Sequence, residues 1–178
     1  CIRGAVVDGH KFVPDVVAKG AKVLIVEEAV EAPEDVTVIL VKDTRYAMAF
    51  ISAAYFGYPA EKLKTIGITG TKGKTTTTYM VKSILENAGY KVGLIGTIEA
   101  IIGDKVIPAK NTTPESYVIQ EYFHEMAEAG CDCVVMEVSS QGLMLHRTQG
   151  FVQILSRIIS DQMNIRILMI ISDASPYF

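Results

Sequence analysis

Apolar residues recur along this chain with two different periods, and their order predicts an α/β fold. Short apolar runs typical of buried strands occur at 5–7, 23–26, 38–41, 66–68, 92–95 and 133–138. Stretches with apolar residues at helical spacing alternate with these runs, at 13–19, 43–56, 75–88 and 115–129. Residues 98–107 form a further apolar stretch with Gly103-Asp104 at its middle, which predicts a hairpin.

This order of elements predicts two domains and a tail. Residues 1–62 form a small α/β domain, incomplete at its start because Cys1 lies inside a strand-like element. Residues 63–151 alternate strand and helix, which predicts a mostly parallel sheet with flanking helices, as in P-loop nucleotide-binding proteins. Ligands of such sheets bind at the carboxyl ends of the strands. Residues 152–178 fit neither pattern.

One loop at such a strand end has the composition of a phosphate-binding site. It reads Gly70-Thr71-Lys72-Gly73-Lys74-Thr75-Thr76 and lies between the strand at 66–68 and the helix at 75–88. Glycines let the backbone approach an anion, and the helix N-terminus directs unpaired N–H groups at it. Lys74 reaches the outer phosphates of a nucleotide, and the Thr75 hydroxyl can bind Mg²⁺. The alternative is a solvated turn rich in glycine and lysine.

Three further clusters fall at or beside predicted strand ends. Glu137 ends an apolar strand and is placed to be a second Mg²⁺ ligand, or alternatively only caps the strand. The loop 111–116 brings an amide and two hydroxyls to a helix start, although Thr113 with Pro114 is also an ordinary helix N-cap. His146-Arg147 offers a fork of N–H donors suited to phosphate or carboxylate, or is a solvated basic pair.

Composition excludes several classes of protein. The 178 residues are 49% hydrophobic with a net charge of −3, and the basic residues are scattered singly, which argues against a nucleic-acid surface. No apolar run reaches the roughly 18 residues that a membrane span needs, and the sequence contains no basic segment followed by the apolar stretch typical of a secretory signal. Three cysteines are too few for a disulfide framework, and we interpret them as reduced thiols. We therefore expect a cytoplasmic monomer.

Together the four clusters resemble one family, the Mur ligases. The resemblance rests on residues 69–76, on Asn111-Thr112-Thr113-Pro114-Glu115-Ser116, on Met136-Glu137-Val138-Ser139-Ser140 and on His146-Arg147. Residues 7–12, 20–22 and 41–45 are similar to the N-terminal domain of the members that extend a UDP-N-acetylmuramoyl dipeptide, so the resemblance covers about residues 1–150. Lys72 and Gln141 depart from the family, which commonly has Asn and His there.

The resemblance implies an ATP-dependent ligase of peptidoglycan synthesis. Such an enzyme joins an amino acid to the D-glutamate of UDP-N-acetylmuramoyl-L-alanyl-D-glutamate through an acyl phosphate. It implies the following roles: Lys74 and Glu137 in catalysis; Gly70, Thr71, Lys72, Gly73, Lys74, Thr75 and Thr76 on ATP; Thr75 and Glu137 on Mg²⁺; and Asn111, Thr112, Thr113, Ser139 and Arg147 on the UDP substrate. Two alternatives stay open, another amide ligase of the superfamily such as a folylpolyglutamate or cyanophycin synthetase, and a non-catalytic nucleotide-binding remnant.

The tail departs from the family. Residues 153–172 are rich in isoleucine without a workable period, where the family has a strand ending in Thr-Asn and then an Asp-His motif. Read one base earlier, and with permitted codon choices, the same message can spell Thr-Asn-Ile-Val-Pro-Asp-His. We therefore hypothesise a frameshift near residue 152, an inactive fragment, and few long-range contacts for 152–178. A native apolar strand or helix at 165–171 is the alternative.

Overall fold

The computed structural model describes residues 1–4, 6–151, 155–160 and 165–172, and for the last two ranges it describes the backbone alone. Contacts divide the chain into two compact units, Cys1–Met48 and the residues from Ala49 onward. This division falls inside a helix. The domain boundary at residue 62 that the sequence indicates stays a prediction.

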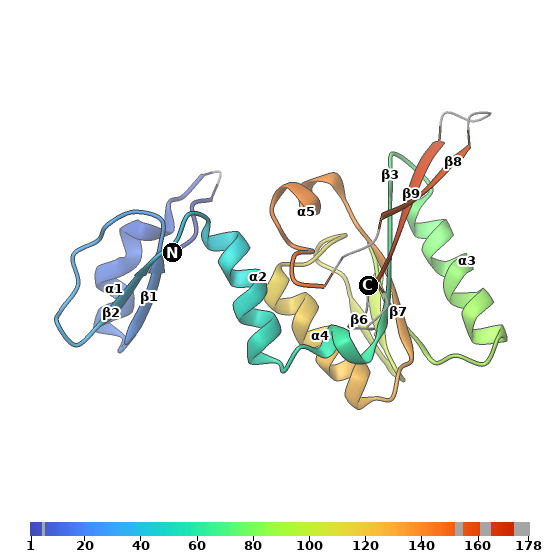
Figure 1. Cartoon of the computed structure of the whole chain (residues 1–178), viewed down its shortest axis with the longest axis horizontal. Helices are drawn as coiled ribbons and strands as arrows, with labels where there is room; N and C mark the ends of the chain where they lie inside the picture. Colours follow the sequence, from blue (N-terminus) through green and yellow to red (C-terminus); the bar gives the residue numbers. More distant parts are fainter. Residues whose placement is uncertain (5, 152–154, 161–164, 173–178) are drawn as a thin grey trace. The chain divides into compact units, whose positions relative to one another are not determined.

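The first unit is a small α/β structure. Strand β1 (Val23–Val26) pairs in parallel with β2 (Thr37–Leu40), and the 3₁₀ turn η1 (Gly9–Phe12) leads into helix α1 (Val13–Ala18) (Figure 1). Val13, Leu24, Val26 and Val36 form its core. The strand expected at 5–7 is wrong for its two described residues: Val6 and Val7 are exposed, and only an isolated bridge between Arg3 and Asp8 forms there.

Helix α2 (Thr44–Tyr55) begins at a well-capped N-terminus. Oε1 of Glu27 accepts hydrogen bonds from the backbone N–H and the hydroxyl of Thr44, at 2.8 and 2.7 Å. Asp43 accepts the N–H of Tyr46 at 2.8 Å. These bonds satisfy N–H groups that have no partner inside the helix, and the bonds from Thr44 lower the pKa of Glu27.

The second unit is built on one mixed sheet of seven strands in the order β6-β5-β4-β7-β3-β9-β8 (Figure 1). Its centre is parallel, with β4 (Val92–Ile95), β7 (Cys133–Glu137) and β3 (Lys64–Gly70) side by side. The hairpin of β5 (Glu99–Ile102) and β6 (Lys105–Pro108) adds antiparallel to β4, which confirms the predicted hairpin. The short turn η2 (Pro59–Lys62) precedes β3.

Helices cover both faces of this sheet (Figure 1). Val134 and Met136 of β7 lie in one core cluster with Phe123 and Met126 of helix α4 (Ser116–Glu128). The alternate residues of β7, Cys133 and Val135, lie in a second cluster with Val81 and Leu85 of helix α3 (Lys74–Asn87). Each buried side chain of this kind contributes about 1.5–3 kcal/mol. The α/β class predicted from the sequence is confirmed.

The tail differs from the sequence-based expectation. Strand β9 (Ile165–Ser172) pairs antiparallel with β3, from Thr65 opposite Ser172 to Gly70 opposite Ile167. Strand β8 (Leu155–Ser160) pairs with β9. The expectation of few long-range contacts is therefore wrong for these two segments. Without β9, the edge of β3 opposite β7 would present unpaired N–H and C=O groups. A segment rich in β-branched residues can pair with such an edge whatever its origin. The reading frame itself stays a hypothesis that the coding DNA would test.

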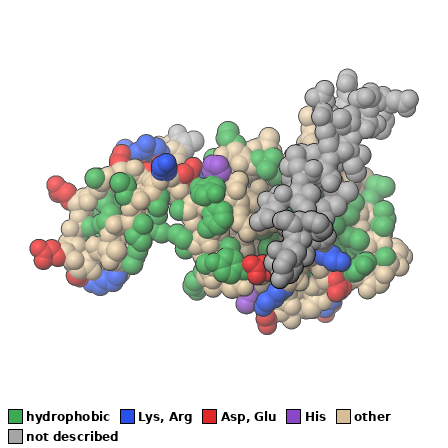
Figure 2. Space-filling model, in the orientation of Figure 1, with side chains coloured by type: hydrophobic (Ala, Val, Ile, Leu, Met, Phe, Trp, Pro, Cys, Tyr) green, Lys and Arg blue, Asp and Glu red, His purple; other side chains and the backbone are tan. Residues whose placement is uncertain are grey.

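The face in Figure 2 shows Lys, Arg, Asp and Glu interspersed with apolar and neutral groups and no basic stripe. Within the described part of the chain, helices fall short of the length and apolar character that a membrane crossing requires.

Candidate active site at the carboxyl edge of the sheet

The three parallel strands end at the same edge of the sheet, and each ends in polar residues. Strand β3 leads into the loop 71–73 and then α3, β4 leads into Gly96-Thr97, and β7 ends at Glu137. Because parallel neighbours direct their carboxyl ends the same way, three segments distant in sequence meet there. Contacts among Thr75, Thr97 and Glu137 show that they do.

The phosphate loop has the backbone form that anion binding needs. Gly73 caps α3 with φ of 79°, a left-handed conformation that favours glycine. Residues 71–73 are exposed, so the N–H groups at the start of α3 face solvent. The Lys74 ammonium donates to the carbonyl oxygen of Gly70 at 2.9 Å. This contact holds the lysine over its own loop, beside the place where an anion would bind.

Glu137 is the buried charge of the site, with 1% of its surface exposed. Its Oε1 accepts the backbone N–H of Thr97 at 2.8 Å, and its Oε2 accepts the hydroxyls of Thr75 at 2.9 Å and Thr97 at 3.0 Å. Three donors to one carboxylate offset part of the cost of burying it. Thr75 and Glu137 thus offer two hard oxygen ligands side by side, the donor set that Mg²⁺ prefers.

The segment after β4 is packed tightly against this carboxylate. A Cβ atom on Gly96 would lie 2.7 Å from Oε1 of Glu137, so a larger residue there would force the carboxylate or the backbone to shift. A separate hydrogen bond joins α3 to β5: the Tyr79 hydroxyl donates to Oε1 of Glu99 at 2.8 Å. Burial, together with this bond, raises the pKa of Tyr79 to about 12, so the hydroxyl keeps its proton. The bond links the helix of the phosphate loop to β5.

A polar cavity of about 320 Å³ adjoins the carboxylate. Its walls include all five residues that the sequence assigns to the UDP substrate: Asn111, Thr112, Thr113, Ser139 and Arg147. Thr97 also lines it, and the hydroxyls of Thr97 and Thr112 are 3.1 Å apart. A hydroxyl carries one proton, so if Thr97 donates to Glu137, Thr112 donates to Thr97. This chain of hydroxyls connects the cavity to the candidate metal site.

Several of the five residues are bonded within the protein itself. Thr113 is 1% exposed; its hydroxyl donates to the carbonyl oxygen of Glu137 at 3.0 Å and accepts the N–H of Ser139 at 2.9 Å. Arg147 donates through one terminal nitrogen to the carbonyl oxygen of Thr113 at 2.8 Å and through the other to the carboxylate of Glu115. Both residues therefore hold the loop in shape. The Ser139 hydroxyl accepts the N–H of Gly142 at 3.0 Å. Asn111 and Thr112 are therefore the better placed of the five to contact a ligand.

Sequence reasoning missed four residues of this region: Thr97, Tyr79, Glu99 and Lys110. Thr97 had a detectable signal, since it follows the strand at 92–95 and so had to reach the same edge as Glu137. Lys110 lines the polar cavity next to Asn111. The pairing of Tyr79 with Glu99 joins a helix to a strand and had no signal in the sequence.

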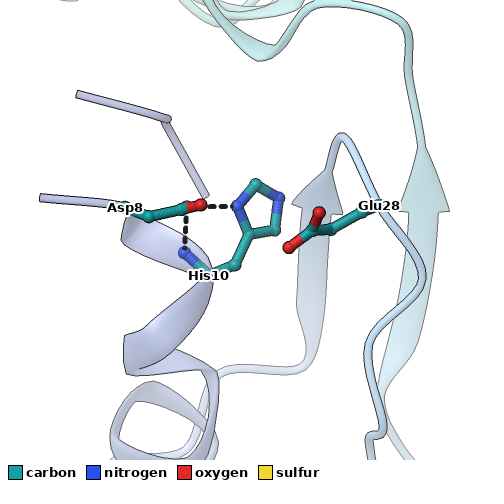
Figure 3. A group of neighbouring side chains, drawn as sticks. All are labelled: Asp8, His10 and Glu28. Atoms are coloured by element: carbon teal, nitrogen blue, oxygen red, sulfur yellow. Dashed lines mark hydrogen bonds and ion pairs between the residues drawn. The ribbon is translucent and has the colours of Figure 1, made fainter. Parts of the chain in front are cut away.

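A cluster in the first unit has the composition of a metal site. Ligand atoms of Asp8, His10 and Glu28 lie within 4.8 Å of one another (Figure 3). However, Nε2 of His10 accepts the N–H of Glu27 at 3.0 Å, so Nδ1 carries the proton and donates to Asp8 at 2.6 Å. Because neither ring nitrogen keeps a free lone pair, we interpret His10 as a structural link between η1 and the end of β1.

A sheet whose parallel strands end in a glycine loop, a lysine and a buried carboxylate is typical of nucleotide-binding α/β proteins. Comparison with known families makes this more specific. The family described as Mur ligase middle domain matches residues 68–161, which is more than half of the chain. The chain belongs to this family.

The relatives agree with that assignment. A UDP-N-acetylmuramoyl-L-alanyl-D-glutamate--2,6-diaminopimelate ligase of Clostridium perfringens is 55% identical over 150 residues, 84% of this chain and 31% of the relative. A ligase of the same name from Bacillus licheniformis is 46% identical over 150 residues, 84% of this chain and 30% of the relative. A solved structure of a protein so named superposes with a TM-score of 0.69 at 25% identity, over 79% of this chain and 28% of that one. The chain spans about a third of the length of these relatives.

Proposed function

We propose that this chain is the part of a peptidoglycan precursor ligase that binds ATP and the UDP substrate. The enzyme would add the third amino acid to UDP-N-acetylmuramoyl-L-alanyl-D-glutamate. The observation that carries the proposal is the hydroxyl chain from the polar cavity through Thr97 to Glu137, which also contacts Thr75 of the phosphate loop. A site for a phosphoryl donor thus adjoins a cavity for its acceptor. The names of the relatives support the substrate.

The reaction needs two displacements. A carboxylate oxygen of the substrate attacks the γ-phosphorus of ATP, and the bond to the bridging oxygen breaks to release ADP. The amine nitrogen of the incoming amino acid then attacks the acyl phosphate, loses a proton, and phosphate leaves. Both steps develop negative charge on phosphoryl oxygens, so positioning and charge neutralisation supply most of the catalysis.

Different residues of this chain bind the phosphates, the metal ion and the acyl substrate. The N–H groups of the loop 70–76 and the Lys74 ammonium bind the phosphates. Thr75 and Glu137 would hold Mg²⁺, which when bound neutralises phosphate charge. Asn111 and Thr112 orient the acyl substrate in the cavity, while Thr113, Ser139 and Arg147 keep the cavity wall rigid.

Replacement of one carboxylate tests this proposal in the full-length protein. Glu137→Gln keeps the shape of the side chain but removes the charge, so the Mg²⁺ concentration for half-maximal activity should rise about tenfold or more. The rate of phosphoryl transfer should fall further than the affinity for the UDP substrate. The measurement is ADP release against Mg²⁺, with Lys105→Met on the distant surface of β6 as control.

Two results would count against the proposal. Unchanged Mg²⁺ dependence would make Glu137 a strand cap and remove it from the chemistry. Tight ATP binding without turnover by the wild type, with the UDP substrate and candidate amino acids present, would favour a non-catalytic nucleotide-binding protein. Turnover with a folate or a cyanophycin primer instead would indicate another amide ligase.

A further inference from the structure

Among the described residues, two cationic side chains lie in the wall of the polar cavity, and they differ in what they contact. Arg147 is largely buried and already spends both terminal nitrogens on Thr113 and Glu115. Its charge is therefore balanced by a carboxylate of the protein. Among the described residues of this wall, Lys110 is the cation without such a carboxylate.

Lys110 is exposed, and in the described residues no carboxylate forms an ion pair with it. It lines two adjoining cavities, the polar one and a more apolar one of about 310 Å³ between the β5–β6 hairpin and α4. Glu115 and Glu121 also line the second cavity. Glu115 is paired with Arg147, so it does not balance the charge of Lys110. A cation with no such partner, in the wall of a ligand-sized cavity, favours an anionic ligand.

We propose that the Lys110 ammonium binds the carboxylate of the substrate's glutamate that does not react. This inference rests on the proposed function, because it needs a substrate ending in glutamate, which has two carboxylates. One of them is activated and must approach the phosphate loop at the Thr97 side of the cavity. Pairing that carboxylate with an ammonium would lower its nucleophilicity. The Lys110 ammonium is better suited to the non-reacting carboxylate. By binding it, Lys110 determines which of the two carboxylates is presented for phosphorylation.

The assignment makes Lys110 a residue that determines substrate specificity, and paired ligands test it. The probes are UDP-N-acetylmuramoyl-L-alanyl-D-glutamate and the analogue in which the non-reacting carboxylate is a carboxamide. Their dissociation constants are measured calorimetrically on the full-length protein. Lys110→Met should weaken binding of the acid about tenfold, the scale of one charge-assisted hydrogen bond, and should leave binding of the amide unchanged.

Two further variants serve as controls. Lys110→Arg should restore binding of the acid, because it restores the charge at similar length. Lys105→Met removes an exposed lysine at the start of β6, five residues before Lys110, that is paired with Glu125 at 2.7 Å outside the cavity. This variant should bind both ligands as the wild type does.

The outcomes separate this inference from the function on which it rests. If the wild type bound the acid and Lys110→Met bound it equally well, or lost acid and amide alike, the Lys110 assignment alone would be wrong. If the wild type bound neither ligand and turned over neither, the proposed substrate would be wrong, and the Lys110 assignment would fall with it.

Discussion

The substitution Gly96→Ala tests how tightly the site is built around its carboxylate. The new Cβ would lie 2.7 Å from Oε1 of Glu137, whereas ordinary contact begins at 3.4 Å. Either the new Cβ or the Glu137 carboxylate must therefore move by about 0.7 Å. The same oxygen accepts the N–H of Thr97 at 2.8 Å, and a movement of that size breaks this bond.

The expected cost follows from these contacts. A hydrogen bond to a charged group contributes about 1.5–3 kcal/mol, and its loss is felt fully because Glu137 is buried. Replacing glycine by alanine also stabilises the protein by about 0.4–1 kcal/mol, because alanine reduces the conformational entropy of the unfolded chain. This gain applies here since Gly96 does not have a positive φ. The net loss of stability is about 1–2 kcal/mol, or roughly 2–8 °C in Tm for a chain of this size.

Thermal and urea denaturation measure that loss, and a double-mutant cycle locates its cause. Glu137→Asp withdraws the carboxylate by one methylene and makes room for the alanine Cβ. Gly96→Ala should therefore cost less in the Glu137→Asp background, with a coupling of at least about 0.5 kcal/mol. Additive effects in the cycle, or a Gly96→Ala variant as stable as the wild type, would refute the close packing of Gly96 against Glu137.

Two further predictions concern single side chains. Lys74→Ala should abolish turnover in the full-length protein and weaken ATP binding while leaving the circular dichroism spectrum and Tm nearly unchanged, because in the described part of the chain the ammonium donates to the Gly70 carbonyl alone. Wild-type turnover in this variant would exclude Lys74 from the mechanism. Asp8→Asn should destabilise the first unit above about pH 4, because bonds from the backbone N–H and ring of His10 lower the Asp8 pKa from 3.8 to about 2. That stabilisation is present above the unfolded pKa and is lost as pH falls toward 2, so denaturation curves of variant and wild type should converge there; a difference independent of pH would contradict it.

Much of the second unit was predictable because its signals are local. The apolar runs at 92–95 and 133–138, the helical period at 75–88 and 115–129, and the turn at Gly103 each specify one element, and the structure has all of them. The phosphate loop was recognisable since glycine and lysine spacing is itself a sequence signal.

What the sequence could not specify depends on tertiary contacts. From the sequence, the Arg147 guanidinium is expected to be available to a ligand. Only the folded chain shows that it donates to the Glu115 carboxylate and the Thr113 carbonyl. Thr97 is one hydroxyl among many until β4 and β7 are placed side by side. The expectation for the tail was wrong since strand pairing requires only an available edge, here that of β3, and not a periodic pattern.

Thr97 belongs to the candidate metal site and to the wall of the polar cavity at once. A ligand that fixes this residue in either place biases its position in the other, so the two binding equilibria are thermodynamically linked. Linkage is reciprocal. If nucleotide binding changes the affinity for the acyl substrate by some factor, binding of the acyl substrate changes the affinity for nucleotide by the same factor. If both ligands of the proposed reaction favour the same position of the Thr97 hydroxyl, this linkage favours the ternary complex over either binary one.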